Sequence, residues 1–431
     1  MSRRGPAPPA TEADYRIDRI GAEGDGTCTR PGGDAMHIAR TLPAELVRAV
    51  AETGSRARLT EVLQASPHRV QPPCPHFSAC GGCALQHWAD APYAAWKRDL
   101  VVAALRRAGF DDPAVAPLVR TPAHARTRMI FTARRGAGLL LGLHAQHGRD
   151  LVDIDGCVVL HPALLALLSP LRAVLNSLAG LRREARLTVN LLTSGPDILV
   201  RADAPASAAD RTRLADFART HGVRRIAWAV EEGPAEIAAG LGTPGQDFAG
   251  VMCAVPPGAF LQASAEGARA IVDAVIAGLP TKMTGKSRII ELYAGNGTIS
   301  FPMAQRARVR AIEGDAASFT ALRHAATGTR VEAVHRDLVR QPLQAKALAG
   351  AAAIVLDPPF AGAAVQMGAI AASGVARVIY VSCNPNALGR EVRVLHEAGY
   401  RLELATPIDQ FLWSAQVEAV AVFTRGATAG P

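Results

Sequence analysis

From about residue 265 to the C-terminus, short apolar segments that suit β-strands alternate with segments that suit helices. This alternation constrains the fold more than any other feature, because it is typical of a doubly wound α/β sheet. The last two strands are expected to pair antiparallel. We expect the strands within residues 287–295, 309–315, 330–337, 352–360, 376–383, 401–409 and 418–425.

Two other regions precede this part of the chain. Residues 15–65 contain short apolar or β-branched runs broken by glycine, which predicts a small β-barrel. Residues 126–260 mix strand-like and helical segments, which predicts an α+β region. We therefore expect a disordered tail at 1–14, the barrel at 15–65, a central domain at 66–260 and the α/β domain at 261–431.

The composition indicates a folded protein with a polyanionic partner. Hydrophobic residues make up 49% of the 431 residues, and no long uncharged apolar run or signal region is present, so we expect a cytoplasmic protein. The net charge of +9 favours a nucleic acid as partner, although an arginine-rich genome would give the same balance. Residues 120–149 hold six arginines and no acidic residue, which suits contact with phosphates.

A glycine-rich turn follows the first strand of the α/β region, in the segment ELYAGNGTIS. Gly295 and Gly297 allow the backbone to approach a ligand closely, and Glu313 at the end of the next strand can accept the ribose hydroxyls of an adenosyl group. The pattern is not GxGxxG, so a dinucleotide is the weaker alternative. Asp337 follows the third strand and suits either contact with an adenine edge or a helix cap.

Three residues that could take part in a reaction lie at the first or last positions of later strands. Asp357 and Cys383 follow the fourth and fifth strands, and Glu418 lies at the start of the last. Ligands of open α/β sheets bind beyond the carboxyl ends of the strands, so these side chains should share one crevice. A thiolate that adds to carbon 6 of uracil makes carbon 5 nucleophilic, and a base must then remove the proton from carbon 5. Taken alone, Cys383 suits packing in the core, and Glu418 suits a solvated position on a strand. Their order along the chain, after the expected cofactor site, favours the catalytic interpretation.

The seven cysteines include a spaced group that suggests a metal site. Cys74, Cys80 and Cys83 form the pattern C-x5-C-x2-C, and Cys157 is the best candidate for a fourth thiolate. Four thiolates could hold an iron–sulfur cluster or zinc, although zinc ligands usually come in C-x2-C pairs. Cys28 and Cys253 are expected to pack in the core.

The segments LDPPFAG, YVSCNP and QVEAVAVF, which follow ELYAGNG, resemble the bacterial RNA uracil-5-methyltransferases. The resemblance covers nearly the whole chain and is greatest to the 23S rRNA enzymes that carry an N-terminal TRAM barrel and a [4Fe-4S] cluster. It implies a Rossmann-like methyltransferase domain, S-adenosylmethionine as methyl donor, 23S rRNA as the favoured substrate with tRNA still open, and a monomer.

The same resemblance implies roles for individual residues. Cys383 is the implied nucleophile and Glu418 the implied proton acceptor. The implied donor-binding residues are Gln262, Tyr293, Glu313 and Asp337, with Asp357 between donor and uracil. The implied cluster ligands are Cys74, Cys80, Cys83 and Cys157.

Several residues depart from the family's usual pattern and bear on the choice of target nucleotide. They are Ser264, Thr298, Phe360, Trp413 and Gln416. Phe360 and Trp413 are expected near the RNA. Two other functional classes are a redox or radical enzyme built on the cluster and a noncatalytic RNA-binding protein. Neither explains Cys383 together with Asp357 and Glu418.

Overall fold

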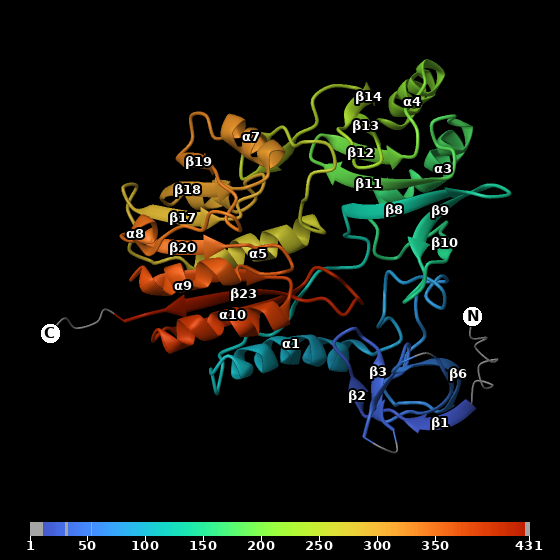
Figure 1. Cartoon of the computed structure of the whole chain (residues 1–431), viewed down its shortest axis with the longest axis horizontal. Helices are drawn as coiled ribbons and strands as arrows, with labels where there is room; N and C mark the ends of the chain where they lie inside the picture. Colours follow the sequence, from blue (N-terminus) through green and yellow to red (C-terminus); the bar gives the residue numbers. More distant parts are fainter. Residues whose placement is uncertain (1–11, 31–32, 53, 427–431) are drawn as a thin grey trace, which may run out of the picture.

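The computed structural model describes residues 12–30, 33–52 and 54–426. Sheets of six, seven and eight strands, together with one two-stranded sheet, make up its β-structure. Figure 1 shows the N-terminal sheet (blue) and the central sheet (green) on one side, and the C-terminal sheet (yellow to red) on the other. No helix in these ranges is long and apolar enough to cross a lipid bilayer.

The N-terminal sheet has the strand order β1-β5-β6-β4-β3-β2 and surrounds a small apolar core that includes Met36, Ile38 and Val47. Its first strand begins at Glu12, inside the tail expected at 1–14, and residues 1–11 of that tail lie outside the described part of the chain. The strands are β1 (Glu12–Arg16), β2 (Arg19–Ile20), β3 (Gly26–Thr29), β4 (Ala35–Ile38), β5 (Leu46–Ala51) and β6 (Arg56–Gln64).

The central sheet has the order β10-β9-β8-β11-β12-β13-β14, and apolar side chains from α3 and α4 pack in its core. Its strands are antiparallel except for the parallel pair β12 and β13, which agrees with the expected α+β region. The elements are β8 (Arg128–Arg135), β9 (Leu139–His144), β10 (Leu151–Asp153), α2 (Pro162–Leu165), α3 (Leu168–Ser177), β11 (Glu184–Leu192), β12 (Gly195–Ala202), α4 (Ala208–His221), β13 (Arg225–Val230) and β14 (Glu236–Gly240). The two-stranded sheet of β15 (Gln246–Phe248) and β16 (Val251–Cys253) follows.

The C-terminal sheet has the order β19-β18-β17-β20-β21-β23-β22-β7. The five strands from β19 to β21 are parallel, and β23 lies antiparallel between β21 and β22, as expected for the last pair. The strands are β17 (Arg288–Leu292), β18 (Arg308–Glu313), β19 (Val331–His335), β20 (Ala353–Leu356), β21 (Arg377–Ser382), β22 (Arg401–Asp409) and β23 (Glu418–Thr424), with β7 (Val119–Arg120) at the edge. The helices are α1 (Asp90–Arg107), α5 (Ala265–Gly278), α6 (Ser300–Ala304), α7 (Ala316–Ala325), α8 (Ala345–Leu348), α9 (Ala364–Ala372) and α10 (Pro385–Glu397).

Helices cover both faces of this sheet, which explains why its strands are almost continuously apolar. In β21, Val378 and Tyr380 pack on one face with α1, α9 and α10, while Ile379 and Val381 pack on the other with α5, α6 and α7. The carboxyl ends of the parallel strands therefore remain the open edge where a ligand can bind.

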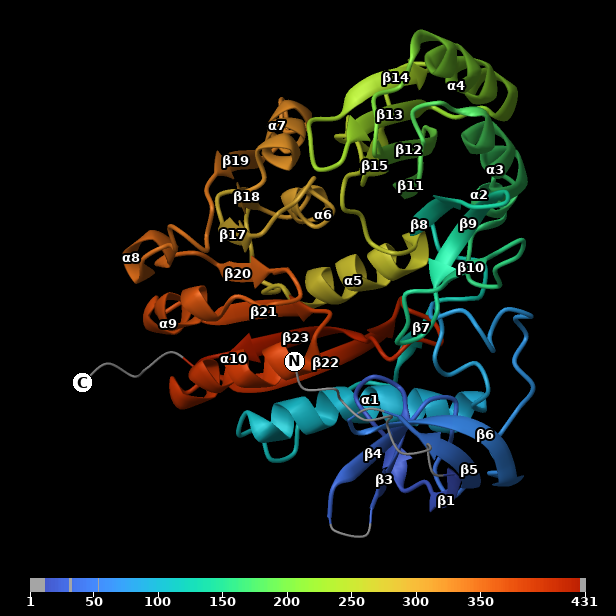
Figure 2. The same ribbon diagram turned by 45° about the vertical axis from the view of Figure 1, so that its right-hand side comes forward.

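The placement of α1 and β7 differs from the expected central domain at 66–260. Val101 and Leu105 of α1 belong to the apolar cluster that contains Val392 of α10, and β7 pairs in parallel with β22. Figure 2 shows both elements beside the red strands of the C-terminal sheet. Sequence periodicity reports that a helix has an apolar face but not which sheet that face covers, so this boundary could not be found from the sequence.

A buried ion pair connects α1 to the loop between β22 and β23. Lys97 is fully buried and donates to Asp409, to the carbonyl of Phe411 at 3.1 Å and to the carbonyl of Gln416 at 2.7 Å. The Tyr93 hydroxyl donates to Asp409 at 2.6 Å. The loop at 410–417 is thus fixed by side chains that lie far from it in sequence.

Replacing Lys97 by Met should lower the free energy of unfolding by about 3–5 kcal/mol, because it leaves the Asp409 carboxylate buried without its cation. Urea unfolding at neutral pH measures this loss. Arg310→Met in β18 is the matched control. The exposed ion pair of Arg310 with Glu332, at 3.7 Å, should contribute less than about 1 kcal/mol to the free energy of unfolding. Equal losses in the two variants would contradict the prediction.

Candidate active site

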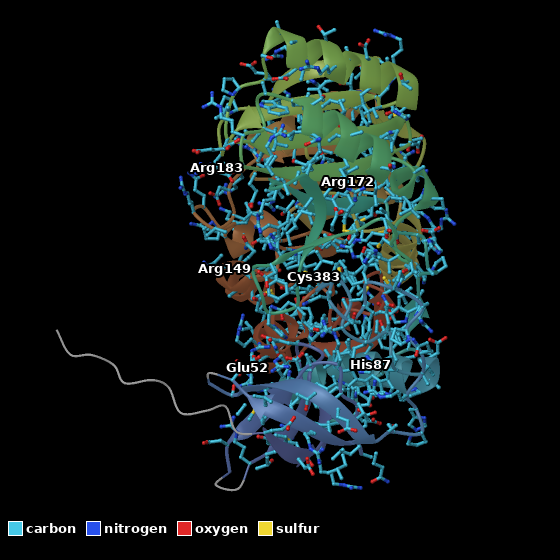
Figure 3. All side chains as sticks on the ribbon, turned by 90° about the vertical axis from the view of Figure 1, so that its right-hand side faces the viewer. Glu52, His87, Arg149, Arg172, Arg183 and Cys383 are labelled. Atoms are coloured by element: carbon cyan, nitrogen blue, oxygen red, sulfur yellow. The ribbon has the colours of Figure 1, made fainter. Side chains whose placement is uncertain are left out.

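One cavity of about 800 Å³ opens at the carboxyl ends of the parallel strands of the C-terminal sheet. All seven residues predicted for the catalytic and donor sites line it, although they come from segments far apart in sequence. They are Gln262, Tyr293, Glu313, Asp337, Asp357, Cys383 and Glu418. In Figure 3, Cys383 lies midway between the N-terminal sheet below and the central sheet above.

One end of the cavity is formed by the glycine turn after β17. The Glu313 carboxylate accepts hydrogen bonds from the backbone N–H groups of Gly295 and Asp315, each at 2.6 Å. Gly297 has a φ of +98°, and a Cβ there would lie 2.4 Å from Phe301, so glycine is required. The turn is therefore rigid, and Glu313 both fixes it and faces the cavity.

Asp337 and Tyr293 border the same end of the cavity. Asp337 follows β19 and accepts a hydrogen bond from the Val339 N–H at 2.9 Å, so it acts as a local cap and also lines the cavity. The Tyr293 hydroxyl is buried and has no hydrogen-bond partner among the described residues. Burial, followed by the charges of Glu391 and Asp337, raises the pKa of Tyr293 to about 12. This hydroxyl is thus a protonated donor that can hydrogen-bond a ligand.

The other end of the cavity holds Cys383 directly after β21. Burial, followed by the nearby Glu418 and Asp357 carboxyl groups, raises the pKa of the Cys383 thiol to about 12. The thiol is therefore protonated at neutral pH in the free protein. A nucleophilic role requires a group that accepts this proton when a substrate binds.

Asp357 and Glu418 also line the cavity, and their carboxyl groups lie close enough to interact. Burial raises the pKa of both carboxyl groups, and the charge of Asp357 further raises that of Glu418. Asp357 accepts a hydrogen bond from Gln262 at 3.1 Å, and Glu418 accepts one from Gln410 at 2.7 Å. The second oxygen of Glu418 is buried without a partner among the described residues. A carboxyl group with a raised pKa is suited to accepting a proton near neutral pH.

The cavity wall contains functional candidates that sequence analysis missed. Glu291 is buried in β17 and receives a hydrogen bond from Ser300, and burial raises its pKa to about 8. A charged residue inside the apolar strand IIEL was a visible signal for it. Phe260 is 66% exposed, and the Arg128 guanidinium lies 4.7 Å from its ring centre. No periodicity or motif distinguished Phe260 in the sequence.

The arginine-rich segment at 120–149 only partly meets the expectation of phosphate contact. Arg126 and Arg128 line the cavity, whereas Arg120 pairs with Asp90 at 3.1 Å and Arg134 pairs with Glu184 at 2.7 Å. The sequence could not show this difference because the acidic partners lie outside the segment.

The two aromatic residues expected near the RNA occupy different places. Phe360 is 58% exposed and lines the cavity. Trp413 is not among the lining residues in the described part of the chain, and its carbonyl accepts hydrogen bonds from the N–H groups of Ala84 and Leu85 at 2.8 and 2.9 Å. Trp413 therefore joins the loop before β23 to the segment that carries the clustered cysteines.

A second cavity of about 250 Å³ is lined by all four cysteines predicted as cluster ligands. They are Cys74, Cys80, Cys83 and Cys157. Burial, followed by the charges of the other three thiols, raises the pKa of Cys83 to about 12. Four thiols around one small cavity form a donor set that fits a tetrahedral zinc or a cubane iron–sulfur cluster.

Cys28 and Cys253 lie apart from that cavity. Both are buried, Cys28 in the core of the N-terminal sheet and Cys253 in a core beside the C-terminal sheet. The expectation that they pack in the core is confirmed.

The doubly wound sheet, the glycine turn after β17 and the carboxylate after β18 define the class of S-adenosylmethionine-dependent methyltransferases. The crystal structure of the Pyrococcus abyssi tRNA (uracil-54, C5)-methyltransferase with S-adenosyl-L-homocysteine shares the fold, with a TM-score of 0.73 and 19% identity. The match covers 96% of this chain and 100% of that chain.

The particular family follows from sequence comparison. The family described as tRNA (Uracil-5-)-methyltransferase matches residues 335–425, which include Cys383 and Glu418. An uncharacterized RNA methyltransferase of Brucella suis is 42% identical over 95% of this chain and 97% of its own length. A 23S rRNA (uracil(1939)-C(5))-methyltransferase of Alkalilimnicola ehrlichii is 32% identical over 99% of this chain and 100% of its own. The chain belongs to the RNA uracil-5-methyltransferases, which use S-adenosylmethionine.

Glu418→Gln should change how stability depends on pH. The folded wild type keeps the Glu418 proton up to about pH 8, whereas the unfolded chain releases it near pH 4.5. The unfolded state binds fewer protons in this window, so wild-type stability falls as pH rises from about 4.5 to 8, by up to ~1.4 kcal/mol per pH unit. The variant lacks this loss and should gain stability relative to wild type across the window. Urea unfolding at several pH values tests this, and a constant difference would contradict it.

Proposed function

We propose that the protein methylates carbon 5 of a uridine in 23S rRNA through a covalent adduct between Cys383 and carbon 6 of the base. The observation that carries the mechanism is the convergence of Cys383, Asp357 and Glu418 on one cavity that also contains the glycine turn. Methylation at carbon 5 requires a nucleophile and a base beside a methyl donor, and these three residues and the glycine turn could provide them.

The proposed reaction begins when the Cys383 thiol loses its proton to the nearby Asp357 carboxylate, which leaves Glu418 ionised for the last step. The thiolate adds to carbon 6 of uracil, and the ring electrons move to form an enolate that is nucleophilic at carbon 5. S-adenosylmethionine supplies the methyl group that carbon 5 takes. Glu418 then accepts the proton from carbon 5, and the restored double bond expels the Cys383 thiolate.

The unpartnered oxygen of Glu418 supports its role as the final base. That oxygen is buried and has no hydrogen-bond donor among the described residues, so it can take a proton from a nucleobase bound in the cavity. Burial raises the pKa of Glu418 to about 8, so the ionised carboxylate is a stronger base than an exposed glutamate and keeps the proton that it takes at neutral pH.

The donor is proposed to bind at the end of the cavity that holds the glycine turn. Glu313 would accept the ribose hydroxyls, Asp337 would meet the adenine edge, and the Tyr293 hydroxyl would donate to the ligand. Gln262 and Asp357 are joined by a hydrogen bond of 3.1 Å and would separate the donor from the uracil. These roles account for the buried hydroxyl of Tyr293, which otherwise lacks a partner among the described residues.

The proposal of 23S rRNA over tRNA rests on the whole-length relationship. The relative named for uridine 1939 of 23S rRNA is 32% identical and aligns over nearly the full chain, including the N-terminal sheet. The N-terminal sheet is the proposed TRAM-like RNA-binding unit. The tRNA enzyme of Pyrococcus abyssi, at 19% identity, supports the fold alone. Methylation of tRNA is the second candidate, because the matching family is named for that substrate.

We further propose that the four cysteines hold a [4Fe-4S] cluster. The cavity of about 250 Å³ and its four thiols suit either that cluster or zinc, and the C-x5-C-x2-C spacing favours iron–sulfur. The group would join the segment at 74–88 to the central sheet, since Cys157 lies just after β10. The methyl transfer uses no electron from it.

The wild-type protein should transfer label from S-adenosylmethionine to carbon 5 of uridine in 23S rRNA, and Cys383→Ala should abolish the transfer. Glu418→Gln should instead accumulate a covalent protein–RNA adduct, seen as a shifted band in denaturing gels, because the proton on carbon 5 is not removed. Cys253→Ala is the control and should retain transfer, since Cys253 packs in the core. Transfer at the normal rate by Cys383→Ala would overturn the mechanism, and label in tRNA alone would overturn the target.

Protein purified without oxygen should contain iron and acid-labile sulfide in equal amounts, about four of each per chain. Cys83→Ser should lose both, because one thiolate ligand is missing, whereas Cys28→Ala should keep them. Metal and sulfide analysis measures this directly. Protein that contains zinc and no sulfide would refute the cluster.

A further inference from the structure

One buried amide lies behind the active site and hydrogen-bonds two of the residues that line it. Gln410 follows β22, is 4% exposed and is absent from the cavity lining. Its Nε2 atom donates to Glu418 Oε2 at 2.7 Å and to Gln262 Oε1 at 2.8 Å. Its Oε1 atom accepts a hydrogen bond from the Ala263 N–H at 3.0 Å. Because a backbone N–H can only donate, this last contact fixes which end of the amide is oxygen.

The amide connects three residues of the proposed mechanism. Gln262 accepts from Gln410 and donates in turn to Asp357 at 3.1 Å. A continuous row of hydrogen bonds thus runs from Glu418 through Gln410 and Gln262 to Asp357. The donor side and the base side of the cavity share this one amide.

The surroundings of Gln410 hold its side chain in place. The preceding residue, Asp409, is bound by Lys97 and Tyr93. On α5, a Cβ at Gly267 would lie 2.6 Å from the Cβ of Gln410, so the absence of a side chain there makes room for it. The amide is therefore positioned before any ligand binds.

Among the described residues, Gln410 provides the only hydrogen bond to the Glu418 side chain. The other ionisable groups that face Glu418 are Asp357 at the end of β20 and Cys383 at the end of β21. Both of these are negative when ionised and repel a second negative charge. A neutral amide that donates to Oε2 favours the ionised carboxylate without being able to take the proton itself.

We propose that Gln410 is a positioning residue, which holds Glu418 with Oε2 bonded and Oε1 directed into the cavity and aligns it with Gln262. This inference rests on the proposed role of Glu418 as the base. When Oε1 receives the proton from carbon 5, the hydrogen bond to Oε2 persists, so the base need not rotate. Gln410 itself touches neither substrate nor donor.

Gln410→Leu replaces the amide with an apolar side chain of similar size. We expect the rate constant for turnover to fall by about 10–100-fold, because Glu418 loses a hydrogen bond to its charged form and removes the proton from carbon 5 more slowly. The protein–RNA adduct should accumulate as it does in Glu418→Gln. The acid limb of the pH–rate profile should move to higher pH by about one unit, because the ionised form of Glu418 loses its donor.

Gln366→Leu is the matched control. Gln366 is a fully buried amide of α9 in the same domain, and it hydrogen-bonds the N–H and carbonyl of Leu343 at 2.8 and 2.9 Å. Its loss should reduce stability without moving the pH–rate profile or producing adduct. Gln410→Met is a second variant that retains the chain length of glutamine, and binding of S-adenosylhomocysteine verifies the folding of each variant.

The outcomes separate this inference from the proposed function. If Glu418→Gln traps the adduct but both Gln410 variants keep the wild-type pH–rate profile and release product normally, the role of Gln410 is overturned and the base stands. If Glu418→Gln turns over normally, the proposed base itself is overturned. A shifted acid limb with accumulated adduct in the Gln410 variants, and not in Gln366→Leu, supports the inference.

Discussion

The buried pair of Lys97 and Asp409 is the interaction on which the arrangement of the active site depends. Lys97 binds Asp409 and two carbonyls of the loop at 410–417, so a helix near the start of the chain fixes the residues just before Glu418. A buried charge left without its partner is strongly destabilising, so this geometry has little freedom to vary. Gln410 follows Asp409 directly, so the contacts that fix Asp409 also fix the backbone at Gln410.

The cavity concentrates ionisable carboxyl and thiol groups at the proposed site of the chemistry. Glu291, Asp357 and Glu418 all have pKa values raised by burial, and the Cys383 thiol beside the last two has its pKa raised as well. Full ionisation of this group is unfavourable, so protons are shared among its members. Arg126 and Arg128 also line the cavity and can compensate the charge of its ionised members and attract a polyanion.

The positions of the site residues were predictable where a general rule applied. Asp357, Cys383 and Glu313 end parallel strands, and strand ends of a doubly wound sheet meet at one edge. Their convergence could therefore be expected from sequence order, and the structure places them around one cavity. The contact of Gln410 with Gln262 and that of Lys97 with Asp409 could not be expected, because each joins segments more than 100 residues apart without any shared pattern. The pairing of Arg134 with Glu184 was likewise decided by a partner in another segment.

The strand order of the C-terminal sheet bears on how the protein is made. The last strand, β23, lies between β21 and β22, and it carries Glu418 at its first residue. During synthesis, Cys383 leaves the ribosome before the strand that completes the sheet beside it. A growing chain at that stage has the thiol without the base, and its sheet has a gap where β23 will insert. The proposed pair of thiol and base is thus completed only when β23 inserts, after the segments proposed to bind RNA have been synthesised.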